Sequence, residues 1–271
     1  MRYGLISLSL LMILALSGSA IAIDDKKPAL TADEIIGKHL AAIGGKEALA
    51  KLKTRVAIGT VRKEDEREAQ IAIMSERPNR VSAIYVFEKY KWQLTYDGDK
   101  TIFRPVLGHE TSVVSGKYQE MASSGLMFND ISLYNLLTAG EANGAKFEAK
   151  GMKKVHGHQA YVVEIKRSKG ETLRAYFDEN FMWIRTDFGR VTITKPLGGF
   201  TNDNVSRAED ETDVEFYFET SDFRDVDGVK LPFKFEQVVT YPIIRLSKVG
   251  TITGTIKEYR HNITIDPQMF K

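Results

Sequence analysis

Residues 214–236 read Val-Glu-Phe-Tyr-Phe-Glu-Thr-Ser-Asp-Phe-Arg-Asp-Val-Asp-Gly-Val-Lys-Leu-Pro-Phe-Lys-Phe-Glu. Two runs in which apolar and polar side chains alternate flank the turn-forming segment Asp225-Val-Asp-Gly228. Because successive side chains of a strand point to opposite faces, this period of two predicts two half-buried strands joined by a turn. The apolar positions are Val214, Phe216 and Phe218 in the first run and Leu231, Phe233 and Phe235 in the second.

The same alternation recurs along most of the chain. Residues 91–96 carry Trp92, Leu94 and Tyr96 on one face, and residues 161–166 carry Tyr161, Val163 and Ile165. Turn signals separate these runs, among them Tyr96-Asp-Gly-Asp99. Such runs from Thr54 onward add up to about a dozen antiparallel strands. The chain is therefore predicted to be mainly β with some α.

Only two helical regions accompany these strands. Thr31-Ala-Asp-Glu34 forms a capping box that starts a helix, Gly44-Gly45 ends it, and a short helix is predicted from Lys46 to Leu52. The second region is 115–139, where the spacing is again helical. Its later turn carries Leu133, Leu136 and Leu137.

These helices are too few and too short to cover a flat sheet of a dozen strands. A sheet with one apolar face must be covered or must curl on itself. We therefore expect a single strongly curved antiparallel sheet, a half-open β-barrel, covered by short helices. Such a sheet encloses either a ligand cavity or a core filled by its own side chains, and the sequence leaves both open. Trp92 and the phenylalanines at 216, 218, 233 and 235 are core residues in either case.

The first 22 residues predict export. Arg2 precedes an apolar run from Leu5 to Leu16, and the segment ends in Ala20-Ile-Ala22, the pattern of a cleaved signal peptide. The run is shorter than the ~20 residues that span a bilayer, which disfavours the alternative of an uncleaved anchor. We expect cleavage near Ala22, a periplasmic protein, and one domain over residues 23–271, because no linker interrupts that stretch.

The composition limits the classes of partner that we expect for this chain. The 271 residues hold 38 Lys and Arg against 36 Asp and Glu, and the two signs are interspersed, so nucleic-acid binding is not expected. Cysteine is absent, which excludes disulfides and a thiol-linked lipid anchor.

Motifs for catalysis or metal binding are weak. The sequence contains no Gly-x-Ser-x-Gly nucleophile elbow. His156 and His158 flank a predicted hairpin glycine, and Asp97 and Asp99 lack the remaining ligands of a calcium loop. His39 is expected to be a hydrogen-bonded residue at a helix interface. We therefore predict no catalytic residues, no metal and no cofactor, and a protein that is not an enzyme.

Several segments, taken in order, resemble the LolA-like superfamily of outer-membrane lipoprotein-sorting proteins. The resemblance lies in 31–49, in the Arg-Pro strand start of 76–80, in the Asp-Gly hairpin of 96–101, in 176–185, in 223–234 and in 262–270. It implies a half-open curved sheet closed by helices, with an apolar interior that holds acyl chains of lipoproteins or lipids in the periplasm.

The expected function is therefore a non-enzymatic carrier that binds acyl chains for transport toward the outer membrane. The predicted cavity lining comprises Trp92, Leu94, Phe216, Phe218, Phe233 and Phe235 from the strands, with Leu133, Leu136 and Leu137 from the covering helices. The alternative is a lipid-sensing or scaffold protein that resembles the envelope-stress regulator RseB and controls an envelope membrane protein.

Overall fold

The computed structural model describes residues 30–63, 67–88, 91–105, 112–114, 134, 137, 144–166, 172–193, 212–240 and 248–271. The predicted signal peptide lies outside these residues. So does nearly all of the predicted helical region 115–139, of which Tyr134 and Leu137 are described, both in helical conformation.

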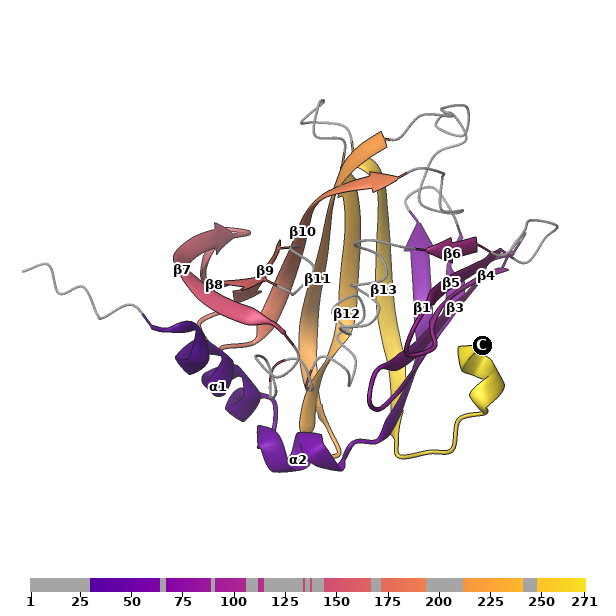
Figure 1. The fold of residues 1–271 in the computed structure, drawn as a ribbon, viewed down its shortest axis with the longest axis horizontal. Helices are drawn as coiled ribbons and strands as arrows, with labels where there is room; N and C mark the ends of the chain where they lie inside the picture. Colours follow the sequence, from indigo (N-terminus) through magenta and orange to yellow (C-terminus); the bar gives the residue numbers. More distant parts are fainter. Residues whose placement is uncertain are drawn as a thin grey trace, which may run out of the picture.

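The thirteen strands of the described residues belong to one sheet (Figure 1), in the order β6-β5-β4-β3-β2-β1-β13-β12-β11-β10-β9-β8-β7. Every neighbouring pair is antiparallel. The strands are β1 (Thr54–Lys63), β2 (Ala69–Glu76), β3 (Arg80–Val86), β4 (Lys91–Tyr96), β5 (Thr101–Pro105), β6 (Ser112–Val114), β7 (Lys146–Val155), β8 (His158–Lys166), β9 (Thr172–Phe177), β10 (Trp183–Ile193), β11 (Thr212–Val226), β12 (Val229–Thr240) and β13 (Lys248–His261). The sheet curves but does not close, because β6 and β7 form its two edges. The predicted open, strongly curved sheet is confirmed.

One pairing joins two halves of this sheet. Strands β1 to β6 form one antiparallel meander and β7 to β13 the other, and β1 pairs with β13 between them. A register shift between Ile58 and Gly59 interrupts this pairing. A Cβ atom at Gly59 would overlap the backbone of Thr255 and Ile256. The β1–β13 pairing, here called the seam, therefore requires a residue without a side chain at this position.

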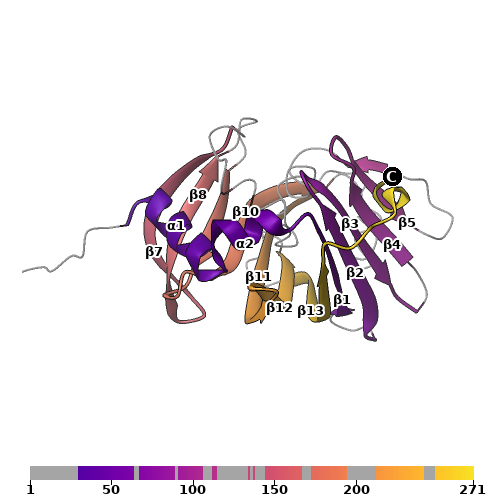
Figure 2. The same cartoon turned by 90° about the horizontal axis from the view of Figure 1, so that it is seen from below.

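Helices α1 (Ala32–Ala42) and α2 (Gly45–Lys51) pack at one end of the sheet. Figure 2 shows α1 beside β7 and β8 and α2 near the β11–β12 hairpin. The capping box of Thr31 and Glu34 is formed as predicted. The backbone amide of Lys230 donates to the carbonyl oxygen of Ile43, which ties the junction between the two helices to β12.

The face of the sheet that packs against α1, here called the inner face, holds the main hydrophobic cluster. The strands contribute alternate residues to it, and α1 and α2 add Ile35, Ile36, Leu40 and Leu49. On the opposite, outer face, β7 to β9 bury only a small second cluster of Val155, Ala160, Val162 and Tyr176. Within the part of the chain that is described, no helix is long and apolar enough to cross a membrane.

The outer face of β3 and β4 differs from the sequence prediction. Alternation predicts a half-exposed strand at 91–96, but Thr95 is fully buried. The 3₁₀ helix η2 (Pro267–Phe270) packs on this side, where the Gln93 side chain donates to the carbonyl oxygen of Met269. The guanidinium of Arg80 lies 4.9 Å from the centre of the buried Phe270 ring. The end of the chain therefore covers a surface that periodicity assigns to solvent.

His39 anchors α1 to the sheet. It is buried, and its ring packs against Phe177 and Trp183 with centroids 5.1 and 5.9 Å away. Its Nδ1 lies 2.8 Å from the carbonyl oxygen of Phe181, so Nδ1 carries the proton and donates. Within the described part of the chain, the buried Nε2 has no hydrogen-bond partner. Burial lowers the pKa of His39 to about 4, because the charged ring would lose its hydration.

Acid should weaken the fold through this residue. Since the unfolded chain takes up the proton near pH 6.5 and the folded chain only near 4, the His39 contribution is complete above pH 6.5. It is lost as the pH falls between these two values, by up to about 3 kcal/mol. Urea denaturation from pH 7 to 4 measures this, and His39→Leu should flatten the profile. As a control at an exposed site, His158→Gln should keep the wild-type dependence of the free energy of unfolding on pH. If His39→Leu also kept that dependence, the role assigned to His39 would be wrong.

Candidate functional site

The centre of the inner face is aromatic. Phe216 and Phe218 on β11 and Phe235 on β12 are all buried in the main cluster. The rings of Phe218 and Phe235 stack with centroids 5.4 Å apart, and Phe216 packs against Phe188 of β10 at 5.1 Å. The Phe235 ring covers Gly254 on β13, where a Cβ atom would overlap its far end. This surface can offer contact area to an apolar group but no acid, base or nucleophile.

The structure brings most of the described lining candidates together. Leu94 and Leu137 belong to the same cluster as the three phenylalanines. Phe233 is buried outside that cluster, between the Tyr259 ring and the Arg224 guanidinium. The backbone of Trp92 lies in β4, and Leu133 and Leu136 fall outside the described residues. Whether these residues contact a ligand remains a prediction.

Sequence periodicity missed part of this face. Trp183 and Phe188 both point into the main cluster although their spacing is odd, because the register of β10 shifts twice. Gln237 was missed for another reason. It follows Leu231 and Phe235 at the same period of two, but it is polar and lies just beyond the run of alternating residues that ends at Glu236. Extending the alternation by one more step would have placed it on the inner face.

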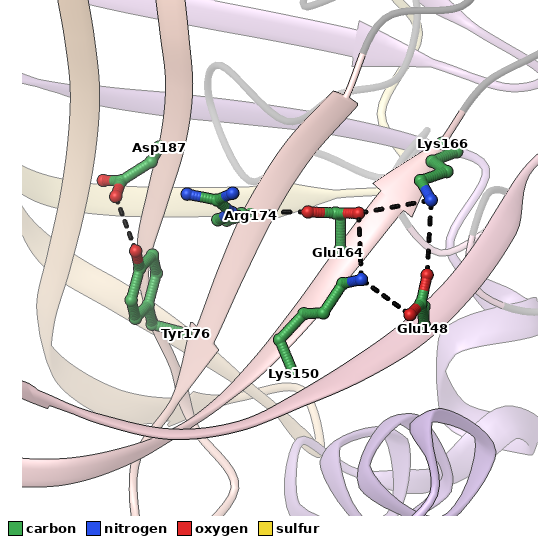
Figure 3. A network of polar contacts seen from close by, with 7 residues as sticks. All are labelled: Glu148, Lys150, Glu164, Lys166, Arg174, Tyr176 and Asp187. Carbon is green, nitrogen blue, oxygen red and sulfur yellow. Dashed lines mark hydrogen bonds and ion pairs between the residues drawn. The ribbon is translucent and has the colours of Figure 1, made fainter.

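The outer face of β7 to β10 is a network of charges (Figure 3). Glu148 and Glu164 lie directly opposite each other, which alone would be repulsive. Lys150 and Lys166 each contact both carboxylates, at 2.6 to 3.4 Å. These contacts lower the pKa of Glu148 and, against the effect of burial, that of Glu164. Arg174 continues the network from Glu164.

Arg185 occupies the centre of the outer face farther along the sheet. Its guanidinium contacts Asp187 at 2.5 Å and Glu219 at 2.9 Å, and lies 3.8 Å from the centre of the Tyr217 ring. The hydroxyl of Tyr176 donates to Asp187. Burial, and then the nearby Asp187 carboxylate, raise the pKa of Tyr176 to about 12. These groups satisfy one another, so the network is structural in character.

A cavity of about 760 Å³ adjoins this network. It opens between the tips of the β7–β8 and β9–β10 hairpins and the outer side of β11 to β13, and most of the residues that line it are polar. His156, at the first hairpin tip, contacts Glu219 at 2.8 Å. The hairpin turn predicted around Gly157 is confirmed. Among the described residues, no three His, Asp or Glu side chains group closely enough to hold a metal ion.

Comparison with known proteins identifies the fold. No protein-family model matches the chain, and no curated protein sequence matches it significantly. Solved structures do match. A domain from Vibrio parahaemolyticus that is described as an outer membrane lipoprotein-sorting protein has a TM-score of 0.52 at 9% identity, over 88% of this chain and 95% of its own. A LolA superfamily protein from Nitrosomonas europaea has a TM-score of 0.50 at 10% identity, over 90% and 98%.

The chain has the LolA-like fold. A DUF1329 family protein from Desulfovibrio piger shares it, with a TM-score of 0.51 at 10% identity over 89% of this chain and 97% of its own. At such low identity the likeness establishes the arrangement of strands and helices and carries no site residue over. The residues of this LolA-like sheet must therefore be tested directly.

Gly254→Ala tests whether Phe235 packs on the inner face as described. The added methyl group should displace the ring and destabilise the LolA-like sheet by about 1–3 kcal/mol. Because leucine lacks the outer ring atoms that clash, Phe235→Leu combined with Gly254→Ala should cost less than the sum of the two single changes. Chemical denaturation of the four proteins measures the coupling. As a control, Gly37→Ala in α1 has open space around its Cβ and should not destabilise the protein. If the losses of stability from Gly254→Ala and Phe235→Leu simply added in the double variant, the described packing would be wrong.

Removal of Arg185 should destabilise more than removal of Arg174. Arg185→Ala leaves Asp187 and Glu219 without their shared cation on a partly buried surface, at a cost of about 2–4 kcal/mol. Arg174 is half exposed and contacts Glu164 at 3.4 Å, so Arg174→Ala should cost about 1 kcal/mol or less. Thermal denaturation at low and high salt compares them. Equal losses of stability in the two variants would show that Arg185 is not the centre of the charge network on the outer face.

Proposed function

We propose that this chain is an exported, non-enzymatic carrier that binds the acyl chains of lipids or lipoproteins on its inner face. The observation that supports this most is the aromatic centre of that face, formed by Phe216, Phe218 and Phe235 in an open, strongly curved sheet. The LolA-like fold supports the same conclusion, since one structure that shares it is described as lipoprotein-sorting. Residues 1–22 would direct export to the periplasm and be removed near Ala22.

The two faces suit this function differently. An acyl chain gains about 0.8 kcal/mol for each CH₂ group that leaves water, with no need for directed polar contacts. On the outer face the same chain would have to cover ion pairs such as Arg185 with Glu219, at a desolvation cost. The inner face therefore offers the favourable surface, and the outer face keeps the loaded protein in solution.

Lipid extraction tests the proposal. The full chain is expressed for export, the mature protein is purified from the periplasm, and its organic extract is analysed by mass spectrometry. A carrier should yield an acyl lipid in roughly stoichiometric amount, and the loaded protein should pass it to acceptor vesicles. Bound lipid without transfer, together with a stable complex with an envelope protein, would favour the lipid-sensing alternative. A clean extract from folded protein would count against both.

Neighbouring residues on opposite faces give a matched pair of variants. Phe218 points to the inner face and Tyr217 to the outer face. Phe218→Ser should weaken binding of a fluorescent acyl probe at least tenfold, since about 1.5–3 kcal/mol of ring contact is lost. Tyr217→Ser should leave probe affinity within twofold. Phe218→Leu, which keeps an apolar side chain, guards against misfolding of the serine variant and should bind nearly as well as wild type.

The inner-face assignment would be wrong if the two serine variants, both folded by circular dichroism, bound the probe equally.

A further inference from the structure

Gln237 is a polar residue at the aromatic centre of the inner face. It lies in β12, two residues after Phe235, and is paired across the sheet with Phe218 on β11 and Ile252 on β13. Both partners belong to the main hydrophobic cluster. Gln237 is only 1% exposed, and its amide nitrogen Nε2 has no hydrogen-bond partner among the residues that the structure describes.

An unpartnered amide at this position needs an explanation. A buried donor that makes no hydrogen bond loses its hydration without compensation, so such groups are rare in folded proteins. Fold stability gives no reason for it, because a leucine or methionine would pack against Phe218 and Ile252 without that loss. The missing acceptor would then come from outside the chain, with a ligand that lies against the aromatic face.

The amide also limits the chemistry of that acceptor. Gln237 carries no charge, and a neutral N–H donor between apolar neighbours suits a neutral oxygen better than a phosphate or carboxylate, which call for cationic partners. A hydrocarbon alone would leave the donor unsatisfied. An ester or amide carbonyl attached to an acyl chain meets both requirements, since the chain covers the phenylalanines while its carbonyl oxygen accepts the hydrogen bond.

We propose that Gln237 is a recognition residue for the carbonyl group of a bound acyl ester or acyl amide. This inference rests on the proposed function, because it names the ligand class of the same inner face. Acylglycerols and the acylated amino terminus of a lipoprotein share this chemistry. Alkyl ethers and plain hydrocarbons lack it, and free fatty acids present a carboxylate instead.

The test compares a short-chain diacylglycerol with the dialkyl ether of the same chain length, on delipidated mature protein. Wild type should bind the ester about fivefold more tightly than the ether, the value of one neutral hydrogen bond. Gln237→Leu and Gln237→Met should bind both ligands equally, at the wild-type affinity for the ether. Both variants should also be at least as stable as wild type without ligand, because the unsatisfied donor is gone. Gln159→Leu, on the exposed part of β8, should keep the ester preference.

The outcomes separate this inference from the proposed function. If wild type binds neither ligand, the carrier function fails and Gln237 has no ligand to recognise. If wild type binds ester and ether equally, or Gln237→Leu keeps the preference, the carrier function stands and the inference is wrong. Tighter binding of a chain-matched fatty acid than of the ester would also overturn it. A diacylated lipopeptide run beside the diacylglycerol distinguishes a lipoprotein from a free lipid as the source of the carbonyl.

Discussion

The pairing of β1 with β13 is the constraint on which the rest of the structure depends. All other strand pairs join sequence neighbours through hairpins or loops, whereas this seam joins residues about two hundred positions apart. Closing so long a loop is entropically costly, so the seam must be held by many contacts at once. It places the two meanders in one continuous sheet and gives them a common inner face. Gly59 matters because any side chain there would push the two strands apart.

The two faces of this continuous sheet are stabilised by different interactions. The inner face gathers the main cluster under α1, while the outer face satisfies its charges by cross-strand pairing, as between Glu164 and Lys166. Exposed ion pairs contribute little stability each, whereas buried apolar area contributes much more. Most of the free energy of folding therefore comes from the same surface that is proposed to hold the ligand.

Local sequence was enough to predict most of the fold. The alternation around Phe216 and Phe235 identified the inner face, and the capping box at Thr31 identified the start of α1. What failed were features set by distant residues. Thr95 is buried on the side of β4 where the C-terminal helix η2 packs, and no pattern within β4 could reveal that packing. The position of Trp183 depends on a register shift, which moves a side chain to the other face without any change in composition.

The candidate site likewise contains residues that the sequence predicted and one, Gln237, that it did not. The aromatic residues that we propose as the lining follow the alternation and can be found in the sequence, whereas Gln237 was missed because it interrupts the apolar series. A residue that breaks the pattern at a buried position weakens the empty protein, so it is tolerated where a ligand compensates. An acyl ligand that covers the phenylalanines and pairs with the amide would then stabilise the fold as it binds. Loading and folding stability would be coupled through one face, and release of the ligand would require a partner or membrane that offers it a comparably apolar environment.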